Sequence, residues 1–328
     1  MRFLIFILLC ILLSPLIIVG LISYTWRIRR ICVPQNISGT ANEPLGGRLV
    51  MHVAGTRRDE VAYKISDHLP SYNKLNKTLL LGSMGLASRL SGYKGSFVAY
   101  PGERPSTLVS MMSHRSDFFD RSILDSLTRN DNPPEQFVVL GAGYDTRCYD
   151  LPDGVAIKCF EVDMPPTLNS KKKALKLAGV PHDHVTFVET DFNQETWMEA
   201  LLAAGFNPNL MTYILWEGVT MYLVEDAVRD TLNLVASLPK GSSVGVDFFT
   251  EDLVKGNPPF EKFSKAMHRG IRYYSENIQF GVPTGETLSA GLEKMLQESG
   301  LTLSRFEYVG SEEDKSPPWY LFAHIDNL

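Results

Sequence analysis

Cysteine is scarce in this sequence, with 4 among 328 residues. So few thiols in so long a chain exclude a small fold that depends on disulfide bonds. A basic excess is also lacking, because 32 lysines and arginines face 37 acidic residues and the net charge is −5. This balance excludes a domain that binds nucleic acid mainly through positive charge, and we expect no nucleic-acid partner.

Acidic residues are absent from the first 30 positions, which contain four arginines and carry +4, whereas the rest has 28 basic and 37 acidic residues and carries −9. Within this segment, residues 3–22 form the one long run without charge. Twenty helical residues span roughly 30 Å, the thickness of the hydrocarbon core of a bilayer. Tyr24 and Trp26 follow at the position of an interfacial aromatic belt. We therefore predict a transmembrane helix within residues 1–30.

A cleaved signal peptide is the weaker interpretation, because its apolar core has about 7–15 residues and ends at a small-residue cleavage site. Three arginines follow the apolar run and one precedes it, which favours a cytosolic body. Two glycosylation sequons, at Asn36 and Asn76, favour a luminal one. We expect a single-pass membrane anchor with the body in the cytosol.

Composition and apolar spacing divide the rest of the chain into three segments. Residues 31–47 are rich in proline, glycine and asparagine and predict a linker. Residues 48–130 have helical spacing and no clear strand, so they predict a helical segment that leads into the core. Residues 131–328 alternate short apolar runs with helical stretches, such as 167–177 and 225–238, which predicts a parallel sheet with helices on both faces.

Seven apolar runs have the length of strands: 136–140, 156–162, 185–189, 211–216, 243–249, 302–309 and 319–325. Only about nine residues separate the last two, too few for a helical crossover of a dozen or more. We therefore predict an antiparallel hairpin at the end of the sheet. Before it, residues 251–287 form a long insertion that contains five aromatic side chains. Such insertions are usually functional, and we predict a substrate lid.

A glycine turn follows the first predicted strand. Gly141-Ala142-Gly143 comes directly after residues 136–140, and glycine lets a backbone turn tightly and approach a ligand. In a doubly wound sheet, nucleotide-like cofactors bind at this turn. Asp163 ends the next strand, about 20 residues further on, where a carboxylate can accept both ribose hydroxyls.

Two cofactor classes use this layout, nicotinamide dinucleotides and S-adenosylmethionine. A dinucleotide fingerprint has glycine or alanine where this chain has Thr146, and Asp145 beside it would repel a pyrophosphate. S-adenosylmethionine has no phosphate and carries a sulfonium cation. These two residues therefore favour S-adenosylmethionine.

From about residue 48 to the end, the sequence resembles the leucine carboxyl methyltransferase-like family of S-adenosylmethionine-dependent O-methyltransferases, and within it the bacterial-type branch with an LGAGxDTR motif. The matching segments are LGAGYDTR at 140–147, FEVDMP at 160–165, Asp191-Phe192, EGVTMYL at 217–223 and HRSDFFD at 114–120. Ser116 and Phe192 stand where the family usually has threonine and leucine. The resemblance implies a class I methyltransferase fold, a Rossmann-like doubly wound α/β sheet of about seven strands with an antiparallel last strand.

The resemblance also implies roles for single residues. Arg115 would bind the methionine carboxylate of the cofactor, and Gly141, Ala142 and Gly143 would let the backbone approach it. Asp163 would accept the ribose hydroxyls.

Two further pairs complete this prediction. Asp191 would accept from the adenine amino group, and Phe192 would supply an apolar wall. Glu217 would lie near the methionine amine or sulfonium, and Tyr222 would line the methyl-transfer centre, which makes both candidate catalytic residues. No metal is expected, because His182 and His184 have no further ligands at metal spacing.

The predicted function is methylation of a carboxylate on a small-molecule or membrane-associated acceptor. A hydroxyl acceptor is the second hypothesis, and it would require a base. A nicotinamide-dependent oxidoreductase and a non-catalytic, membrane-tethered protein that binds the cofactor are the alternatives from other classes.

Overall fold

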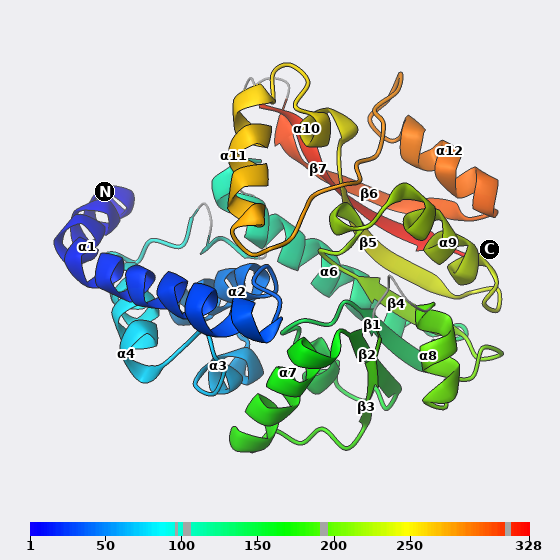
Figure 1. The fold of residues 1–328 in the computed structure, drawn as a ribbon, viewed down its shortest axis with the longest axis horizontal. Coiled ribbons are helices and arrows are strands. Elements are labelled where there is room, and N and C mark those ends of the chain that lie inside the picture. The colour runs from blue at the N-terminus through cyan, green and yellow to red at the C-terminus, as the bar shows by residue number, and fades with distance from the viewer. Residues whose placement is uncertain (96–97, 101–105, 191–195, 312–315) are drawn as a thin grey trace. The chain divides into compact units, whose positions relative to one another are not determined.

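The computed structural model describes residues 1–95, 98–100, 106–190, 196–311 and 316–328 (Figure 1). The chain divides into two compact units. Unit 1 comprises residues 1–117, 143–150 and 166–182, and unit 2 comprises residues 118–142, 151–165 and 183–328.

Unit 1 is built from helices, as expected for residues 48–130. Its helices are α1 (Arg2–Arg27), α2 (Asn42–Ala54), α3 (Glu60–Ser66), α4 (Lys74–Lys77), α5 (Ser83–Ser91) and most of α7 (Pro165–Leu177). A π-helical turn, η3 (Thr78–Gly82), joins α4 to α5. Helix α6 (Met111–Leu127) begins in unit 1 and ends in unit 2.

Residues 31–47 differ from the linker that their composition predicts. The turns η1 (Ile28–Cys32) and η2 (Val33–Gln35) continue from α1, and α2 already begins at Asn42. Ile37 and Leu45 are buried in this segment. Apolar side chains at these two positions hold it in the helical unit, although proline, glycine and asparagine surround them.

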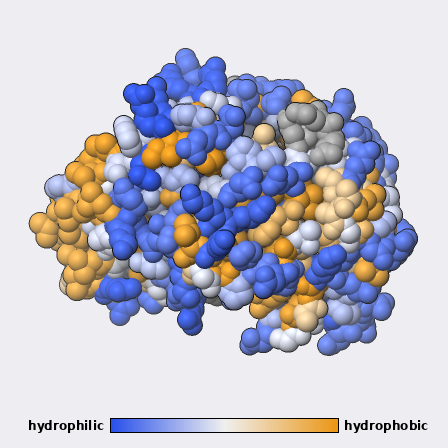
Figure 2. Space-filling model, turned by 60° about the horizontal axis from the view of Figure 1, so that its bottom comes forward, coloured by the Kyte–Doolittle hydropathy of each residue, from blue (hydrophilic) through white to orange (hydrophobic). Residues whose placement is uncertain are grey.

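Helix α1 is long and apolar enough to cross a membrane by length and composition, and only 11% of its most apolar window is buried. Its apolar side chains gather at the left of the surface in Figure 2. Proline is accommodated inside the helix at Pro15, as membrane helices tolerate.

Unit 2 contains a seven-stranded sheet in the order β3-β2-β1-β4-β5-β7-β6. The strands are β1 (Gln136–Leu140), β2 (Lys158–Asp163), β3 (Val185–Glu189), β4 (Thr212–Trp216), β5 (Ser243–Phe249), β6 (Thr302–Ser311) and β7 (Ser316–Asp326). Strands β1 to β5 pair in parallel, whereas β7 pairs antiparallel with both β5 and β6. The predicted class I methyltransferase sheet and its final hairpin are therefore confirmed.

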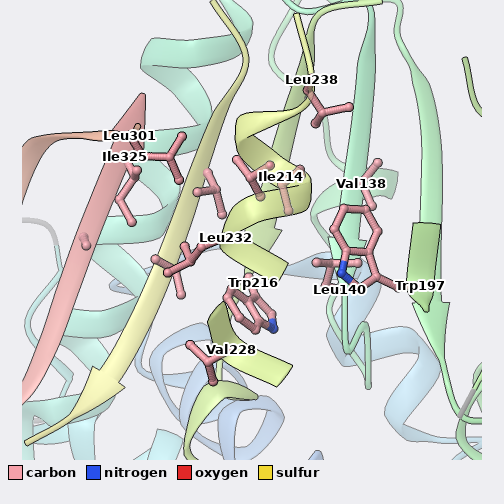
Figure 3. Packing of buried hydrophobic residues seen from close by; sticks show 14 of the residues in the cluster. Val138, Leu140, Trp197, Ile214, Trp216, Val228, Leu232, Leu238, Leu301 and Ile325 are labelled. Carbon is pink, nitrogen blue, oxygen red and sulfur yellow. The ribbon is translucent and has the colours of Figure 1, made fainter. Parts of the chain in front are cut away.

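The central strands β1 and β4 are buried along their whole length. Parallel strands that are covered on both faces are typically continuous apolar runs, as these two are. Part of the hydrophobic core that covers the sheet comes from three helices, α8 (Trp197–Ala203), α9 (Glu225–Ala236) and α12 (Ala290–Ser299). In Figure 3, Val228 and Leu232 of α9 lie beside Trp216, and Trp197 of α8 lies beside Val138 and Leu140.

The insertion at residues 251–287 contains α10 (Glu251–Lys255) and α11 (Glu261–Arg272) and then returns to the end of β5. Val282 donates its N–H to the carbonyl of Phe249 at 2.8 Å and accepts from Glu251 at 2.8 Å. Phe260 and Phe280 are buried in unit 2. These two aromatic side chains therefore stabilise the insertion, and its function as a lid stays a prediction.

Candidate active site

The carboxyl ends of β2, β1 and β4 lie next to one another in unit 2, because these strands are parallel neighbours in that order. From β1 the chain continues to β2 and β3 on one side, whereas β4 continues to β5 on the other. Open α/β sheets bind ligands outside the carboxyl ends at such a reversal of strand order. Gly141, Asp163 and Glu217 come at or directly after these three ends.

Gly141 directly follows β1 and has φ +66°, a backbone conformation that L-residues with a side chain rarely adopt. A Cβ atom at this position would lie 2.3 Å from Cγ2 of Val219. The next residue, Ala142, donates its N–H to the carbonyl of Val162 at 3.0 Å, which extends the pairing of β1 with β2. Both the conformation and the space therefore require glycine at 141.

Asp163 is the last residue of β2 and is half-buried. Its Oδ1 accepts the backbone N–H of Met164 at 2.6 Å, and its carbonyl accepts the N–H of Thr190 at 3.1 Å. The carboxylate is thus fixed at the edge of the sheet, where a ribose would require an acceptor.

Glu217 follows β4 in a turn that Asp247 of β5 holds. Gly218 donates its N–H to Oδ1 of Asp247 at 2.7 Å, and Thr220 Oγ1 donates to the Asp247 carbonyl at 2.5 Å. The other carboxylate oxygen of Asp247 accepts the Tyr320 hydroxyl at 2.6 Å, and both residues are buried. Because the turn after β4 is bonded to Asp247, this aspartate positions Glu217.

Asp247 is a residue that the sequence analysis missed. It is the one charged residue in the run SVGVDFF and is fully buried. A charged residue is almost never fully buried unless it is paired, so an acid inside an apolar strand was the signal that could have found it.

Tyr222 is half-buried in the short turn η7 (Thr220–Tyr222), which follows Glu217. Its carbonyl accepts Nε2 of Gln279 at 2.7 Å, and the carbonyl of Met221 accepts the N–H of Gln279 at 2.8 Å. The end of the 251–287 insertion is therefore bonded to the segment that follows β4. This contact brings the predicted lid to the edge of the sheet within unit 2.

The other predicted site residues belong to unit 1 or fall outside the described residues. Arg115 is buried on α6, and it belongs with Gly143 to unit 1. Asp191 and Phe192 lie outside the described residues. Within unit 2 the structure brings Gly141, Ala142, Asp163, Glu217 and Tyr222 to one edge of the sheet, and the roles of all the predicted site residues stay predictions.

The second half of the LGAGYDTR motif is part of a charged cluster in unit 1. Its members are Arg48, Arg57, Asp59, Asp145, Thr146 and Arg147. Arg48 donates to Oδ2 of Asp145 at 3.0 Å and to the carbonyl of Tyr144 at 2.7 Å. Thr146 Oγ1 donates to Oδ1 of Asp59 at 2.9 Å. Residues of α2 and of the turn before α3 therefore fix the motif.

Both carboxylates of this cluster stay ionised. Burial acts to raise the pKa of Asp145, but Arg147 and Arg48 outweigh it and hold that pKa below its usual range. Burial likewise acts to raise the pKa of Asp59, but Arg48 and Arg57 outweigh burial and lower that pKa. Because Arg48 and Arg147 are paired with Asp145, the charge of this residue alone does not decide between the two cofactor classes.

Comparison with known proteins shows which family and which relatives the chain resembles. The family described as leucine carboxyl methyltransferase matches residues 90–236. YktD of Bacillus subtilis (strain 168) is 36% identical over 187 residues, which are 55% of this chain and 57% of that protein. A Mycobacteroides abscessus protein is 32% identical over 168 residues, or 50% of this chain and 51% of its own length. Both are named, provisionally, as S-adenosyl-L-methionine-dependent methyltransferases.

Solved structures resemble the chain more distantly. A DUF574 family protein from Streptomyces avermitilis has 14% identity and a TM-score of 0.48, covering 86% of this chain and 97% of its own. Geranyl diphosphate C-methyltransferase from Streptomyces coelicolor A3(2) has 12% identity and a TM-score of 0.45, covering 67% of this chain and 82% of its own. The chain spans about half the length of the curated relatives it matches. Over residues 90–236, slightly less than half of its length, the chain is similar to the leucine carboxyl methyltransferase family.

Proposed function

We propose that the protein is an S-adenosylmethionine-dependent methyltransferase. The observation that carries the proposal is the edge of the sheet in unit 2, where a glycine turn follows β1 and acids follow β2 and β4. The family match and the names of the relatives support it.

The residues at this edge suit the chemical groups of the cofactor. Asp163 offers a fixed carboxylate to the ribose hydroxyls, and Gly141 lets the backbone turn sharply directly after β1. Glu217 would lie near the methionine amine or the sulfonium, whose positive charge a carboxylate attracts. In the proposal, Arg115 binds the methionine carboxylate, because a guanidinium can form a bidentate pair with it.

The remaining site roles follow the family pattern. Gly143 continues the turn beside the cofactor, Asp191 accepts from the adenine amino group and Phe192 covers the ring. Tyr222 lines the transfer centre beneath the returning insertion. Bound S-adenosylmethionine supplies a methyl group that a sulfonium activates for displacement.

The proposed acceptor is a carboxylate. Its oxygen is already a nucleophile at neutral pH, since a carboxyl group ionises near pH 4. The oxygen forms a bond to the methyl carbon while the carbon–sulfur bond breaks and its electron pair goes to sulfur. The protein would then act by orienting the two reactants and excluding water.

We further propose that α1 attaches the protein to a membrane, that the acceptor is a small or membrane-associated molecule, and that the body faces the cytosol. Asn76 of the second sequon is buried, and its side chain bonds the backbone of Asn73 and Ser71 at 2.8 and 3.1 Å. A glycan on this side chain is incompatible with the folded unit. The sequon at Asn76 therefore does not support a luminal orientation.

Calorimetric titration of the full chain in detergent tests the cofactor. We expect S-adenosylmethionine to bind and NADH to give no heat. Binding of NADH instead would establish the oxidoreductase alternative. Binding without transfer of a labelled methyl group to any carboxylate or hydroxyl acceptor would favour the non-catalytic alternative. Failure of folded protein to bind S-adenosylmethionine would overturn the proposal.

A further inference from the structure

Helix α1 has a partner along most of its length. The partner segment consists of residues 72–93, which include α4, η3 and α5. The ring of Phe6, near the start of α1, lies 5.0 Å from that of Tyr93, and the ring of Tyr24, near its end, lies 5.0 Å from that of Tyr72. The start of α1 therefore lies beside the end of the partner segment, and the end of α1 lies beside its start, so α1 and the partner segment run antiparallel.

The two helical segments touch at their backbones. A Cβ atom at Gly20 of α1 would lie 2.8 Å from the backbone nitrogen of Leu80, so only glycine fits there. At the end of α1, Arg27 Nε donates to the carbonyl of Pro70 at 2.8 Å. Close approach at a small residue is typical of tightly packed helices, and α1 is therefore a packed element of unit 1.

The partner segment is itself fixed to other helices of unit 1. A Cβ atom at Gly85 of α5 would lie 3.0 Å from Val53 of α2, on which α5 packs. Lys77 Nζ donates to the carbonyl of Tyr63 at 2.6 Å and to Asp67 at 2.9 Å. Helix α1 therefore lies on a layer of folded helices that also carries charged groups.

Many outward side chains of this pair are apolar. Five on α1 are 62 to 73% exposed: Leu4, Leu8, Ile11, Leu12 and Ile22. On the partner segment, Leu75, Leu86 and Leu90 are 46 to 64% exposed. The exposed leucines and isoleucines on these two packed segments are more numerous than the scattered apolar residues of an ordinary soluble surface.

The charge of both segments has one sign. Residues 1–42 and 68–95 contain no acid, whereas each carries four lysines or arginines. Cations lie at both ends of α1, at Arg2 and at Arg27, Arg29 and Arg30. Basic residues around an apolar helical face are typical of segments that lie in the interface of an anionic membrane.

We propose that α1 and the partner segment lie together in the interface of an anionic lipid bilayer, with the axis of α1 along the membrane plane. If α1 crossed the bilayer in this packed state, it would take the exposed Arg89 of α5 into the hydrocarbon core, where a charged group is costly. The basic residues at both ends of α1 then contact headgroups of a single leaflet. The proposal thus replaces the single-pass anchor by a monotopic attachment and does not depend on the proposed chemistry.

Protease protection in sealed vesicles of phosphatidylcholine with phosphatidylserine tests this orientation. The full chain carries an epitope tag before Met1 and is reconstituted from detergent, and molecules whose body is accessible from outside are scored. We expect external protease to remove the tag from these molecules, because both ends of α1 lie on one side. A protected tag would show that α1 spans the bilayer and would overturn the proposal.

Binding of matched variants tests whether the partner segment enters the lipid. The double variant Leu86→Ser, Leu90→Ser is compared with the control Leu177→Ser, Leu202→Ser, whose leucines are similarly exposed at 57 and 45%. We expect the first pair to weaken binding to the anionic vesicles about tenfold, because two leucine side chains lose contact with lipid, and the control pair to bind as the parent does. Equal binding by all three folded proteins would overturn the proposal, as would self-association on size-exclusion chromatography that the first pair alone abolishes.

Discussion

At the scale of single residues, one buried acid holds the candidate catalytic turn. Asp247 accepts from Gly218 and from Tyr320, and Glu217 directly precedes Gly218. Charged residues inside an apolar strand are rare, and here the carboxylate is satisfied by donors from the turn after β4 and from β7. The position of Glu217 therefore depends on a residue that lies 29 positions beyond Gly218 in the sequence, and no local motif reveals it.

Replacing this acid should cost stability. Asp247→Ala leaves the buried Tyr320 hydroxyl and the half-buried N–H of Gly218 without acceptors, and each such loss costs about 1–3 kcal/mol. We expect the free energy of unfolding in urea to fall by about 2–4 kcal/mol. Tyr320→Phe removes one donor and should cost about 1 kcal/mol. An alanine variant as stable as the parent would contradict the assigned hydrogen bonds.

His52 gives stability a pH dependence. Its Nδ1 accepts the N–H of Asp59 at 3.1 Å, which requires a neutral ring, and burial lowers its pKa although Glu60 and Asp59 oppose that shift. Since the folded-state pKa lies below the unfolded value near 6.5, this contribution is fully present above about pH 6.5 and is lost as the pH falls through the folded pKa. We expect the urea midpoint of the parent to fall relative to that of His52→Gln on acidification. Parallel curves for the two proteins would contradict this assignment.

At the scale of elements, α2 and the turn before α3 hold the glycine motif through buried charge. Arg48 is 4% exposed and bonds both Asp145 and the carbonyl of Tyr144. Such a pair is costly to break, because removing one partner leaves a buried charge uncompensated. The helical segment that precedes the sheet therefore has a structural function at the motif.

Arg48→Met should destabilise the protein by about 3–5 kcal/mol, the usual cost of breaking a buried pair. The matched control is Arg58→Met, because Arg58 pairs with Glu60 on the surface, with its side chain 83% exposed. We expect the control to change unfolding by no more than about 1 kcal/mol. Urea denaturation of both variants measures the difference, and similar values for the two would refute the buried cluster.

The elements also show what the sequence could predict. Strands β1, β3 and β5 have the predicted bounds, because buried parallel strands are continuous apolar runs that end at turns. The hairpin β6–β7 followed from the length of its connection. The helical turns within residues 31–47 and the packing of α1 on its partner segment were missed, since both depend on contacts between residues far apart in the sequence.

At the scale of the whole molecule, the sequence predicts the residues of the candidate site but not the residues that support them. The motifs predicted that Gly141, Asp163 and Glu217 meet at one edge of the sheet, because parallel strands end on the same side, and β1, β2 and β4 are neighbours. The supporting residues Asp247 and Arg48 could not be predicted, because their partners lie 29 and 97 positions away. Long-range hydrogen bonds of this kind leave no periodic pattern in the sequence.

The central claim is that S-adenosylmethionine binds at the edge formed by β2, β1 and β4. The most direct measurement is the calorimetric affinity of Asp163→Ala for the cofactor, compared with the parent and with Asp153→Ala, an exposed aspartate of the same unit. Loss of the charged acceptor for the ribose should weaken binding by about tenfold or more, because a hydrogen bond to a charged group contributes about 1.5–3 kcal/mol, whereas Asp153→Ala should bind as the parent does. Equal affinity of all three folded proteins would contradict the account.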